Sequence, residues 1–445
     1  MPSRSIQGFS KYNKEQRIDA LIKKYGFDRS LRTFLKLCEV GDESVQKIID
    51  DLSENPVSSF PFPFSVAPNF VVNGKNLFFP LVSEESSVVA ALGNAAGFWA
   101  RRGGFHAEVL GTEKKGQVHF KWGGNAEQLK LLFPEIREKL LADCAPLTEK
   151  MKERGGGITG IVLKSQPHIL PHYFQLDASF ETCNAMGANF INSCLEQMGK
   201  SLQDYFRVSK AISDCDRDCE IIMAILSNYT PESRVCAWVE CPVSELLDGK
   251  PEAECEAFAQ RFEQAVHISQ LDVSRAVTHN KGIFNGIDAL AVATGNDFRA
   301  IEACGHAFAS RNGQYSGFSD VRIHDKKFYF SIELALAVGV VGGVTAVHPM
   351  AKLAIKILDH PSAKELMMYL AVAGLASNFA AVRALVSVGI QKGHMKMHLS
   401  NIMNQLQIPE EHRIQIQAYF QDKTVSFSAV EEFWKSCELR GSGCE

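Results

Sequence analysis

The chain has 445 residues, and its 47 lysine and arginine residues against 51 aspartate and glutamate residues give a formal net charge of −4. This balance excludes a polybasic nucleic-acid-binding protein. Apolar residues make up 46% of the chain and charged residues 22%, which is typical of globular proteins and excludes a disordered one. The length predicts two or three domains with sizeable cores.

The N-terminal region predicts helices followed by a β-hairpin. Residues 14–50 alternate charged and apolar side chains at helical spacing, which predicts one or two amphipathic helices. After a proline-rich stretch, Asn73-Gly74 stands between two apolar runs and predicts a hairpin turn. A helix should follow from Ser86 to about Arg102 and end at Gly103-Gly104.

Short strands alternate with amphipathic helices from about residue 112 to residue 225. This pattern predicts an α+β fold in which a small α/β domain is inserted into a large, helix-rich domain. We expect the large domain to comprise residues 1–111 and 226–387, and the small domain residues 112–225. Residues 388–445 predict a C-terminal helical segment, and residues 283–293 predict a helix of the large domain.

Membrane, secretory and metal-binding features are missing from the sequence. The longest apolar run, 366–382, is shorter than the roughly 20 residues of a membrane span. The polar N-terminus has no signal-peptide core. The twelve cysteines are therefore expected in a reducing compartment, and the pairs 215/219 and 236/241 do not have the spacing of a four-thiolate zinc site. We expect a cytoplasmic protein with no membrane, nucleic-acid or metal partner.

A glycine-rich segment, residues 155–160, contains the GxGxxG pattern of dinucleotide-binding folds. In a Rossmann unit these glycines follow a strand and open a helix. Here a charged helical stretch precedes the glycines and a strand over 161–163 follows, so the order is reversed. The pattern therefore favours a loop that lets the backbone approach a ligand, or one that merely turns.

Three polar segments stand out beside apolar sequence: residues 84–87, 279–288 and 294–297. A carboxylate at a helix start is usually a cap, and a single lysine is usually solvated. None of the three segments establishes a catalytic site by itself.

Five motifs nevertheless occur in order along the chain. They are Glu84-Glu85-Ser86-Ser87-Val88-Val89-Ala90-Ala91, Asn184-Ala185-Met186-Gly187-Ala188-Asn189, His279-Asn280-Lys281-Gly282-Ile283, Thr294-Gly295-Asn296-Asp297 and Ser387-Val388-Gly389-Ile390-Gln391-Lys392-Gly393-His394-Met395. This set resembles the soluble, bacterial and archaeal class II type of 3-hydroxy-3-methylglutaryl-coenzyme A (HMG-CoA) reductase, over most of the chain from about residue 8. The resemblance implies a nicotinamide-dependent oxidoreductase that reduces HMG-CoA in two hydride steps to mevalonate and CoA, in isoprenoid biosynthesis.

The resemblance also implies roles for individual residues. Lys281 would stabilise the oxyanion, Glu85 would transfer protons, Asp297 would tune both, and His394 would protonate the departing CoA thiolate. The positions that match substrate-binding residues are Ser87, Arg275 and Asn285, with Arg275 suited to the free carboxylate. The positions that match cofactor-binding residues are Gly156, Gly157, Asn184, Met186, Gly187 and Asn189. The segment after Gly393 resembles a C-terminal flap that closes over substrate.

These roles constrain the environment of the acid. The dipole of a helix start favours an ionised Glu85, whereas a proton donor must be protonated. Glu85 must therefore be desolvated, or lie close to another carboxylate such as Asp297. A helix over 283–293, at about 1.5 Å per residue, spans roughly 16 Å and separates Lys281 from Asp297. We therefore predict that these two residues meet between subunits, in agreement with the homodimer, or larger oligomer of dimers, that the resemblance implies.

Two departures from the family pattern bear on the cofactor. Asn184 replaces an aspartate, and Gly160, with Lys164 beyond it, stands where NAD-preferring members carry an acidic residue. Because an acid repels a 2′-phosphate whereas Gly and Lys accept it, we expect NADPH, with NADH as the alternative. The inserted domain is expected to bind it through a ferredoxin-like fold. Two rival functions remain: an NAD-dependent enzyme that converts mevalonate to HMG-CoA, and a CoA-binding family member impaired in catalysis.

Overall fold

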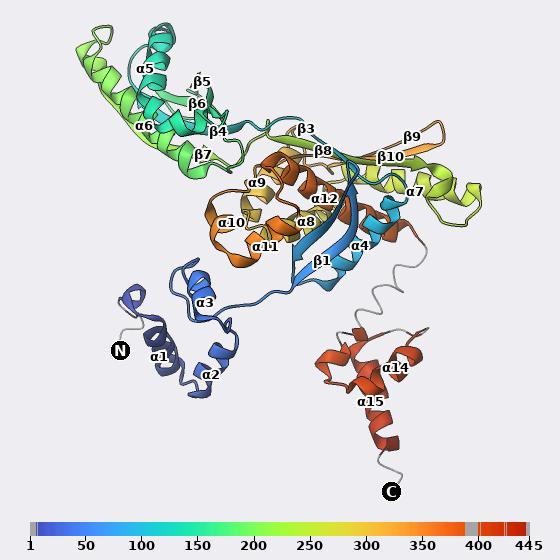
Figure 1. The fold of residues 1–445 in the computed structure, drawn as a ribbon. Coiled ribbons are helices and arrows are strands. Elements are labelled where there is room, and N and C mark those ends of the chain that lie inside the picture. Colours follow the sequence, from blue (N-terminus) through green and yellow to red (C-terminus); the bar gives the residue numbers. More distant parts are fainter. Residues whose placement is uncertain are drawn as a thin grey trace.

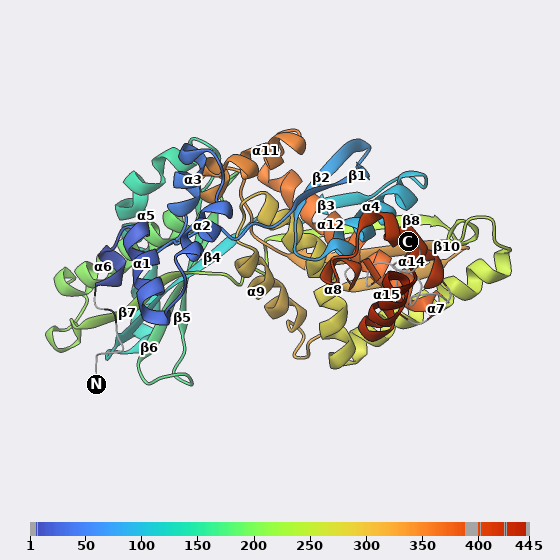
Figure 2. The same cartoon turned by 90° about the horizontal axis from the view of Figure 1, so that it is seen from below.

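The structure is a computed structural model that describes residues 6, 8–387, 399–400, 402–421, 423 and 425–441. In chain order it consists of an N-terminal helical arm, a large domain, a small domain inserted into the large one, and a C-terminal group of helices (Figure 1). Seen from below, the small domain and the large domain lie end to end (Figure 2).

The N-terminal arm contains three helices, one more than the pattern predicted. After a short 3-10 turn, η1 (Phe9–Lys11), come α1 (Lys14–Tyr25), α2 (Ser30–Leu37) and α3 (Glu43–Asp50). Asn13 caps α1 and Asp42 caps α3, and the ion pair between Lys14 and Asp50 (2.8 Å) joins these two helices. Among the described residues before β1, Ile18 is the one buried apolar side chain, so the arm has almost no core of its own.

The large domain is built around an antiparallel hairpin, a four-stranded antiparallel sheet and a bundle of helices. Before the insertion its elements are β1 (Phe64–Val72), β2 (Lys75–Val82), α4 (Ser86–Ala100) and β3 (His106–Val109). After the insertion they are β8 (Arg234–Pro242), η3 (Val243–Glu245), α7 (Glu252–Leu271), α8 (Val273–Ala293), α9 (Phe298–Ala309), β9 (Ser319–His324), β10 (Lys327–Ala335), α10 (Gly343–Val347), α11 (Pro349–Ile357) and α12 (Ala363–Val386). The sheet order is β3-β8-β10-β9.

The predicted hairpin and the helix that follows it are confirmed. β1 pairs with β2 through Asn73 (φ 48°) and Gly74 (φ 81°), two positive φ angles that a tight hairpin turn requires. Helix α4 ends just before Gly103 and Gly104, which both have positive φ.

Helix α12 forms the centre of the large-domain core. Its residues from Leu366 to Val382 are mostly buried, and they pack against α8, α4 and β8. Within the described residues it is the one helix long and apolar enough to cross a membrane, yet 67% of its apolar window is buried inside the protein. A helix that is apolar all round is expected at such a central position.

Helix α8 begins ten residues earlier than the predicted helix over 283–293, so that prediction was wrong at its start. Asp272 ends α7 and caps α8, where its side chain accepts a hydrogen bond from the backbone N–H of Arg275 (2.6 Å). Lys281 therefore lies inside the helix and not in the segment before it.

The small domain has the strand–helix–strand–strand–helix–strand order of a ferredoxin-like fold. Its elements are β4 (Lys114–Trp122), α5 (Ala126–Lys152), β5 (Gly157–Ser165), β6 (Tyr173–Glu181), α6 (Ala188–Val208), η2 (Asp214–Asp216) and β7 (Cys219–Ser227). The sheet is antiparallel in the order β5-β6-β4-β7, and apolar side chains of α5 and α6 cover one of its faces. Helix α5 continues through Pro134 and Pro146 as far as Lys152.

The C-terminal group includes α14 (Glu410–Tyr419) and α15 (Phe427–Gly441). Seven buried apolar side chains between Leu399 and Val430 give it a small core of its own. Helices are therefore present in the described part of the predicted C-terminal helical segment.

Candidate active site

The structure brings Glu85 and Lys281 together within one chain. Nζ of Lys281 lies 3.5 Å from Oε2 of Glu85, and the hydroxyl of Ser87 donates a hydrogen bond to Oε1 of the same carboxylate. Glu85 stands at the start of α4, but its side chain accepts no capping hydrogen bond from that helix. The Glu85 carboxylate thus contacts Lys281 and Ser87. Capping of α4 does not explain why a glutamate stands at this position.

Small residues let α8 approach α12 closely and so fix the position of Lys281. The hydroxyl of Ser377 on α12 donates a hydrogen bond to the carbonyl of Gly282 (2.7 Å). A Cβ at Gly286 would lie 2.4 Å from the carbonyl oxygen of Ala373. Only glycine permits this approach, which explains why Gly286 follows Lys281 at this spacing.

A cavity of about 310 Å³ opens beside the Glu85 carboxylate. Helix α8 contributes Asn285 and Asp288 to its wall, and Phe298 at the start of α9 closes another side. The remaining lining residues are Phe62, Val82, Ser83, Glu84, Val88, Ala289 and Val292. An apolar cavity with a few convergent polar groups is the common form of a small-molecule site.

Asp297 caps α9 and does not pair with Lys281 in this chain. Its carboxylate accepts a hydrogen bond from the backbone N–H of Ala300 (3.2 Å) and forms an ion pair with Arg299 (3.2 Å). Asp288, and not Asp297, is the aspartate among the residues that line the cavity beside Glu85. Asp297 is nevertheless close to the cavity along the chain, because its neighbour Phe298 lines it.

The two glycine-containing motifs of the small domain lie side by side. Gly157 at the start of β5 pairs with Glu181 at the end of β6, two residues before Cys183. Gly157 (φ 129°) and Gly187 (φ 93°) have backbone conformations that favour glycine, and Gly187 precedes the N-terminus of α6. The order helix, glycines, strand confirms that the motif is not a Rossmann fingerprint.

The loop before α6 docks on the large domain through Gly339. Val340 donates a backbone hydrogen bond to the carbonyl of Asn184 (2.9 Å), and a Cβ at Gly339 would lie 2.4 Å from the nitrogen of Met186. Gly339 also donates its N–H to the side chain of Asn296 (2.9 Å). The predicted cofactor loop and the segment that carries Asp297 are therefore joined through one short stretch of backbone.

A family model described as hydroxymethylglutaryl-coenzyme A reductase matches residues 15–399. The chain belongs to the hydroxymethylglutaryl-coenzyme A reductase family. It is 33% identical over 408 residues to a probable reductase of this kind from Borreliella burgdorferi, covering 90% of this chain and 89% of that protein. It is 32% identical over 405 residues to the 3-hydroxy-3-methylglutaryl-coenzyme A reductase of Archaeoglobus fulgidus, covering 90% and 87%.

Solved structures of the family are similar over the same length. A class II reductase from Streptococcus pneumoniae, bound to NADPH in open conformations, superposes with a TM-score of 0.69 at 34% identity and covers 86% of this chain and 100% of that chain. Another structure of the Streptococcus pneumoniae reductase has a TM-score of 0.71 at 32% identity and covers 97% and 100%. The fold expected from the motifs is thereby confirmed.

Asn184, which departs from the reductase pattern, has a structural partner. Its Oδ1 accepts a hydrogen bond from the backbone N–H of Ala363, the first residue of α12 (2.9 Å). An aspartate offers the same oxygen acceptor, so the substitution preserves this bond between the small-domain loop and the large domain.

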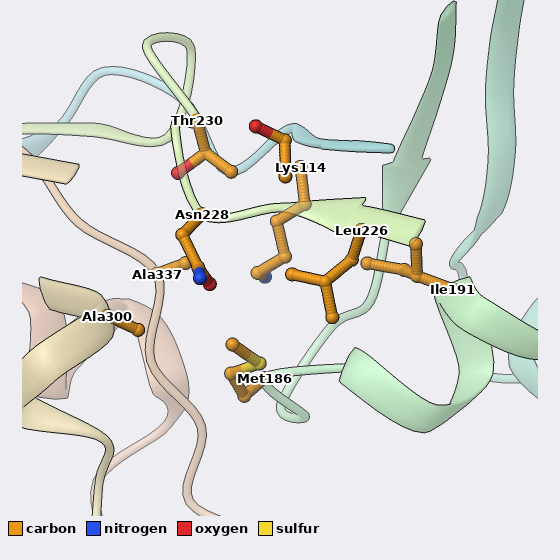
Figure 3. A pocket seen from close by; sticks show the side chains of 9 residues that line it. Lys114, Met186, Ile191, Leu226, Asn228, Thr230, Ala300 and Ala337 are labelled. Carbon is orange, nitrogen blue, oxygen red and sulfur yellow. The ribbon is translucent and has the colours of Figure 1, made fainter. Parts of the chain in front are cut away.

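A buried lysine that no sequence motif singles out supports the same loop. Nζ of Lys114 donates a hydrogen bond to the hydroxyl of Thr182 (2.7 Å), and burial lowers the pKa of this lysine, an effect that Glu181 partly offsets. Figure 3 shows the end of Lys114 between Asn228 and Met186, in a cavity of about 10 Å³ that has room for about one water molecule. Lys114 lies where the chain enters the small domain.

The other predicted site residues and motif residues of α8 differ in their surroundings. Asn285 lies on the cavity wall, one turn beyond Lys281. Arg275 projects from α8 roughly 120° away from Lys281, because six residues at about 100° each separate them. His279 and Asn280 are buried in structural hydrogen bonds, His279 with Ser319 (2.8 Å), and desolvation lowers the pKa of His279 to about 3.

The predicted thiolate-protonating residue, His394, lies outside the described residues, as do Gly389 and Gly393 of the same motif. Within the described part of the chain, no cluster of three or more His, Cys, Asp or Glu side chains could hold a metal ion.

Proposed function

We propose that this protein is an NADPH-dependent HMG-CoA reductase that converts HMG-CoA to mevalonate and CoA for isoprenoid biosynthesis. The observation that carries the proposal is the pair of Lys281 and Glu85 beside the cavity, in a chain of the reductase family. A cation and a carboxyl group held 3.5 Å apart are what reduction of a thioester carbonyl requires.

The residues act on the charge that develops on the carbonyl oxygen. Bound NADPH supplies the hydride for both reductions. The Lys281 ammonium stabilises the negative oxygen that hydride addition creates, and Glu85 donates the proton that neutralises it. Ser87 orients Glu85 by donating its hydroxyl hydrogen to that carboxylate, which leaves the Ser87 oxygen as an acceptor for the hydroxymethylglutaryl group. The amide of Asn285 offers a donor to the same group. We assign protonation of the departing CoA thiolate to His394 from the motif resemblance.

Arg275 is proposed to bind the free carboxylate of the substrate. A guanidinium is suited to this role because it offers paired N–H donors to a carboxylate. Burial lowers the pKa of Arg275 from its ordinary value, and His279, one turn further along α8, is neutral at pH 7. Substitution by Lys should raise the KM for HMG-CoA more than it lowers kcat, since a bidentate contact is lost.

The small domain, residues 112–225 in our assignment, is proposed to bind NADPH. Backbone N–H groups at the N-terminus of α6, where Met186, Gly187 and Asn189 stand, would bind phosphate oxygens. The adjoining Gly156 and Gly157 would offer further backbone N–H groups. Gly160 on β5 has free space where a side chain would stand, so nothing there excludes a 2′-phosphate. Lys164 forms an ion pair with Asp177, so its charge is already partly balanced. The lack of a side chain at Gly160 is therefore the stronger support for a preference for NADPH.

Initial rates of nicotinamide oxidation with HMG-CoA, measured with NADPH and NADH, test the function. We expect faster oxidation of NADPH and release of free CoA thiol. A preference for NAD⁺ with mevalonate and CoA would favour the degradative direction. No turnover of either cofactor in either direction, with CoA binding retained, would favour a non-catalytic family member.

We propose that the working form is a homodimer. Leu37 of the arm is 78% exposed, Phe34 61% and Phe60, in the segment before β1, 85%, while the arm has almost no core. Apolar side chains presented in this way need a partner surface, and a second copy is the simplest one. Light scattering should give the mass of a dimer. Phe34→Glu should weaken the dimer, whereas Leu131→Glu, at an 81% exposed position on α5, should not.

Whether Lys281 and Asp297 act from different subunits stays a prediction. Mixing Lys281→Ala and Asp297→Ala subunits should restore some activity if they do. If activity does not recover after confirmed subunit exchange, both residues act from one chain. Such an arrangement is compatible with the position of Phe298, the neighbour of Asp297, on the wall of the cavity beside Glu85.

We place the enzyme in the cytoplasm. Every cysteine of the described residues is a free thiol, including the exposed Cys215. Free thiols of this kind are typical of a reducing compartment.

A further inference from the structure

Asp288 shares a face of α8 with two residues of the proposed site. It lies seven residues after Lys281 and three after Asn285, and residues at these spacings project from the same side of a helix. Asn285 and Asp288 line the cavity beside Glu85. The three polar side chains therefore form a row along α8 that ends in a carboxyl group.

The Asp288 carboxyl is partly buried, and one of its two oxygens lacks a hydrogen bond within the described part of the chain. Its Oδ1 is inaccessible to solvent and has no hydrogen-bond partner among the residues that the structure describes. A buried ionised carboxylate in this state is costly, and a protonated carboxyl avoids most of that cost. Desolvation, followed by the charge and hydrogen bond of Glu302 on α9, raises the pKa of Asp288 to about 8. Asp288 therefore carries a proton at neutral pH.

The charged groups around Asp288 are mainly acidic. Helix α9 contributes Glu302, and the segment between β2 and α4 contributes Glu84 and Glu85 to the cavity wall. Lys281 lies two turns away on the same helix and is paired with Glu85. Between Leu366 and Val382, helix α12 has no charged residue to offer. No cation of these elements pairs with Asp288 in the described part of the chain, so a neutral carboxyl is the form that this setting favours.

We propose that Asp288 is a positioning residue that holds a proton beside the cavity and returns it to Glu85 after each proton transfer. This inference rests on the proposed reductase function and deepens it. The predicted role of Glu85 requires that it be desolvated or lie close to another carboxyl group, and Asp288 lines the same cavity as Glu85. A cavity of about 310 Å³ with polar groups on its wall has room for several water molecules that connect the two carboxyl groups.

The proton balance of the step is simple. Glu85 gives its proton to the oxygen of the reduced substrate and becomes a carboxylate. The O–H bond of Asp288 then breaks, its proton moves through cavity water to Glu85, and Asp288 becomes a carboxylate beside Glu302. Bulk solvent returns one proton to the Asp288–Glu302 pair before the next hydride step. No bond other than O–H bonds changes, and no oxidant or reductant is needed.

The pH dependence of kcat tests this inference. In the unmodified enzyme kcat should fall as the pH rises through about 8, the pKa of Asp288. Asp288→Asn keeps the shape but cannot release a proton in this way, so kcat at pH 7 should fall by about 100-fold with little change in the KM for HMG-CoA. Glu302→Gln should shift the alkaline fall of kcat to lower pH, because the charge that raises the pKa of Asp288 is removed. Asp288→Glu should recover part of the rate.

A second readout separates this inference from the reductase proposal. Carbon-13 NMR of labelled aspartate carboxyl groups should contain one resonance that titrates near pH 8 and is missing from Asp288→Asn. Asp325→Asn, in the exposed turn between β9 and β10, should leave kcat and this resonance unchanged. The inference would be overturned if Asp288→Asn and Glu302→Gln both had the same kcat–pH profile as the unsubstituted enzyme, or if the titrating resonance were absent. A lack of reductase activity in the unmodified protein would overturn the proposed function, and the NMR result would still decide whether Asp288 holds a proton.

Discussion

Lys281 and Glu85 form an ion pair of 3.5 Å although both side chains remain largely exposed, 66% and 45% respectively. An exposed ion pair contributes little to stability, on the order of 0–1 kcal/mol. Under the proposed function, the pair acts instead on a bound substrate. Substitutions of Lys281 or Glu85 should therefore change activity without a large change in the free energy of unfolding.

Lys281→Ala should abolish most of the activity and leave the fold intact. Removing one group that stabilises an oxyanion costs about 100- to 1000-fold in kcat. The change in the free energy of unfolding should stay below about 1 kcal/mol. Kinetics and thermal unfolding of the same preparation check both parts. Lys326→Ala, at a lysine that is 76% exposed and paired with Glu252, is the matched control and should change neither.

Asn184→Asp should retain cofactor binding, whereas Asn184→Ala should weaken it. The acceptor oxygen that receives the N–H of Ala363 is preserved in aspartate and lost in alanine. Loss of this bond should cost about 1 kcal/mol in stability and raise the KM for NADPH. An Asn184→Asp variant with a large loss of kcat would show that the amide has a role beyond this bond.

Gly339→Ala should displace the proposed cofactor-binding loop that contains Met186, because Gly339 of the large domain contacts this loop. Its Cβ would meet the backbone nitrogen of Met186 at 2.4 Å, and overpacking of this kind costs about 1–3 kcal/mol. We expect a higher KM for NADPH together with lower thermal stability. Gly41→Ala, where a Cβ meets nothing within 4 Å, is the control. Unchanged cofactor kinetics in Gly339→Ala would separate this contact from cofactor binding.

His279 should destabilise the folded protein as the pH falls below about 6.5, the ordinary pKa of histidine. In the folded state its pKa is lowered to about 3, first by desolvation and then by Arg275. Between these two values the unfolded chain binds a proton that the folded chain does not, so stability falls with decreasing pH by up to about 1.4 kcal/mol per pH unit. Urea unfolding at pH 7, 6 and 5 should show a shallower fall in His279→Gln than in the unmodified protein.

Gly160→Asp should shift the cofactor preference toward NADH. The position has space for the new side chain, whose nearest neighbour would be Cβ of Ser179 at 4.0 Å. A carboxylate there repels a 2′-phosphate, and about 1.4 kcal/mol of repulsion corresponds to a tenfold change. The ratio of kcat/KM for NADPH to that for NADH should fall by at least about tenfold. Gly249→Asp, in a turn of the large domain, should leave the ratio unchanged.

Local signals predicted much of the fold. Asn73-Gly74 specified its hairpin because both residues tolerate positive φ, and the reversed order of helix and strand around Gly157 was enough to exclude a Rossmann fold. The start of α8 was missed because Asp272 serves two helices at once, so no loop separates α7 from α8. Such a junction leaves no turn residues in the sequence to mark it.

The site could be predicted only in part. The motifs around Lys281 and Glu85 also pointed to Asn285, and the structure brings Glu85 and Asn285 to one cavity. Asp288 was visible at helical spacing from Lys281, but its significance depends on burial against Glu302, which sequence spacing does not reveal. Lys114 was missed because its burial arises only where the two domains meet.

The most direct test of the central claim is a stoichiometric assay of HMG-CoA reduction. Purified protein is incubated with HMG-CoA and excess NADPH, and NADPH oxidised, free CoA thiol and mevalonate are measured together. Two molecules of NADPH should be consumed for each mevalonate and each CoA formed, and Lys281→Ala should form neither product at a comparable rate. Release of CoA thiol without NADPH oxidation, or full activity in Lys281→Ala, would contradict the account.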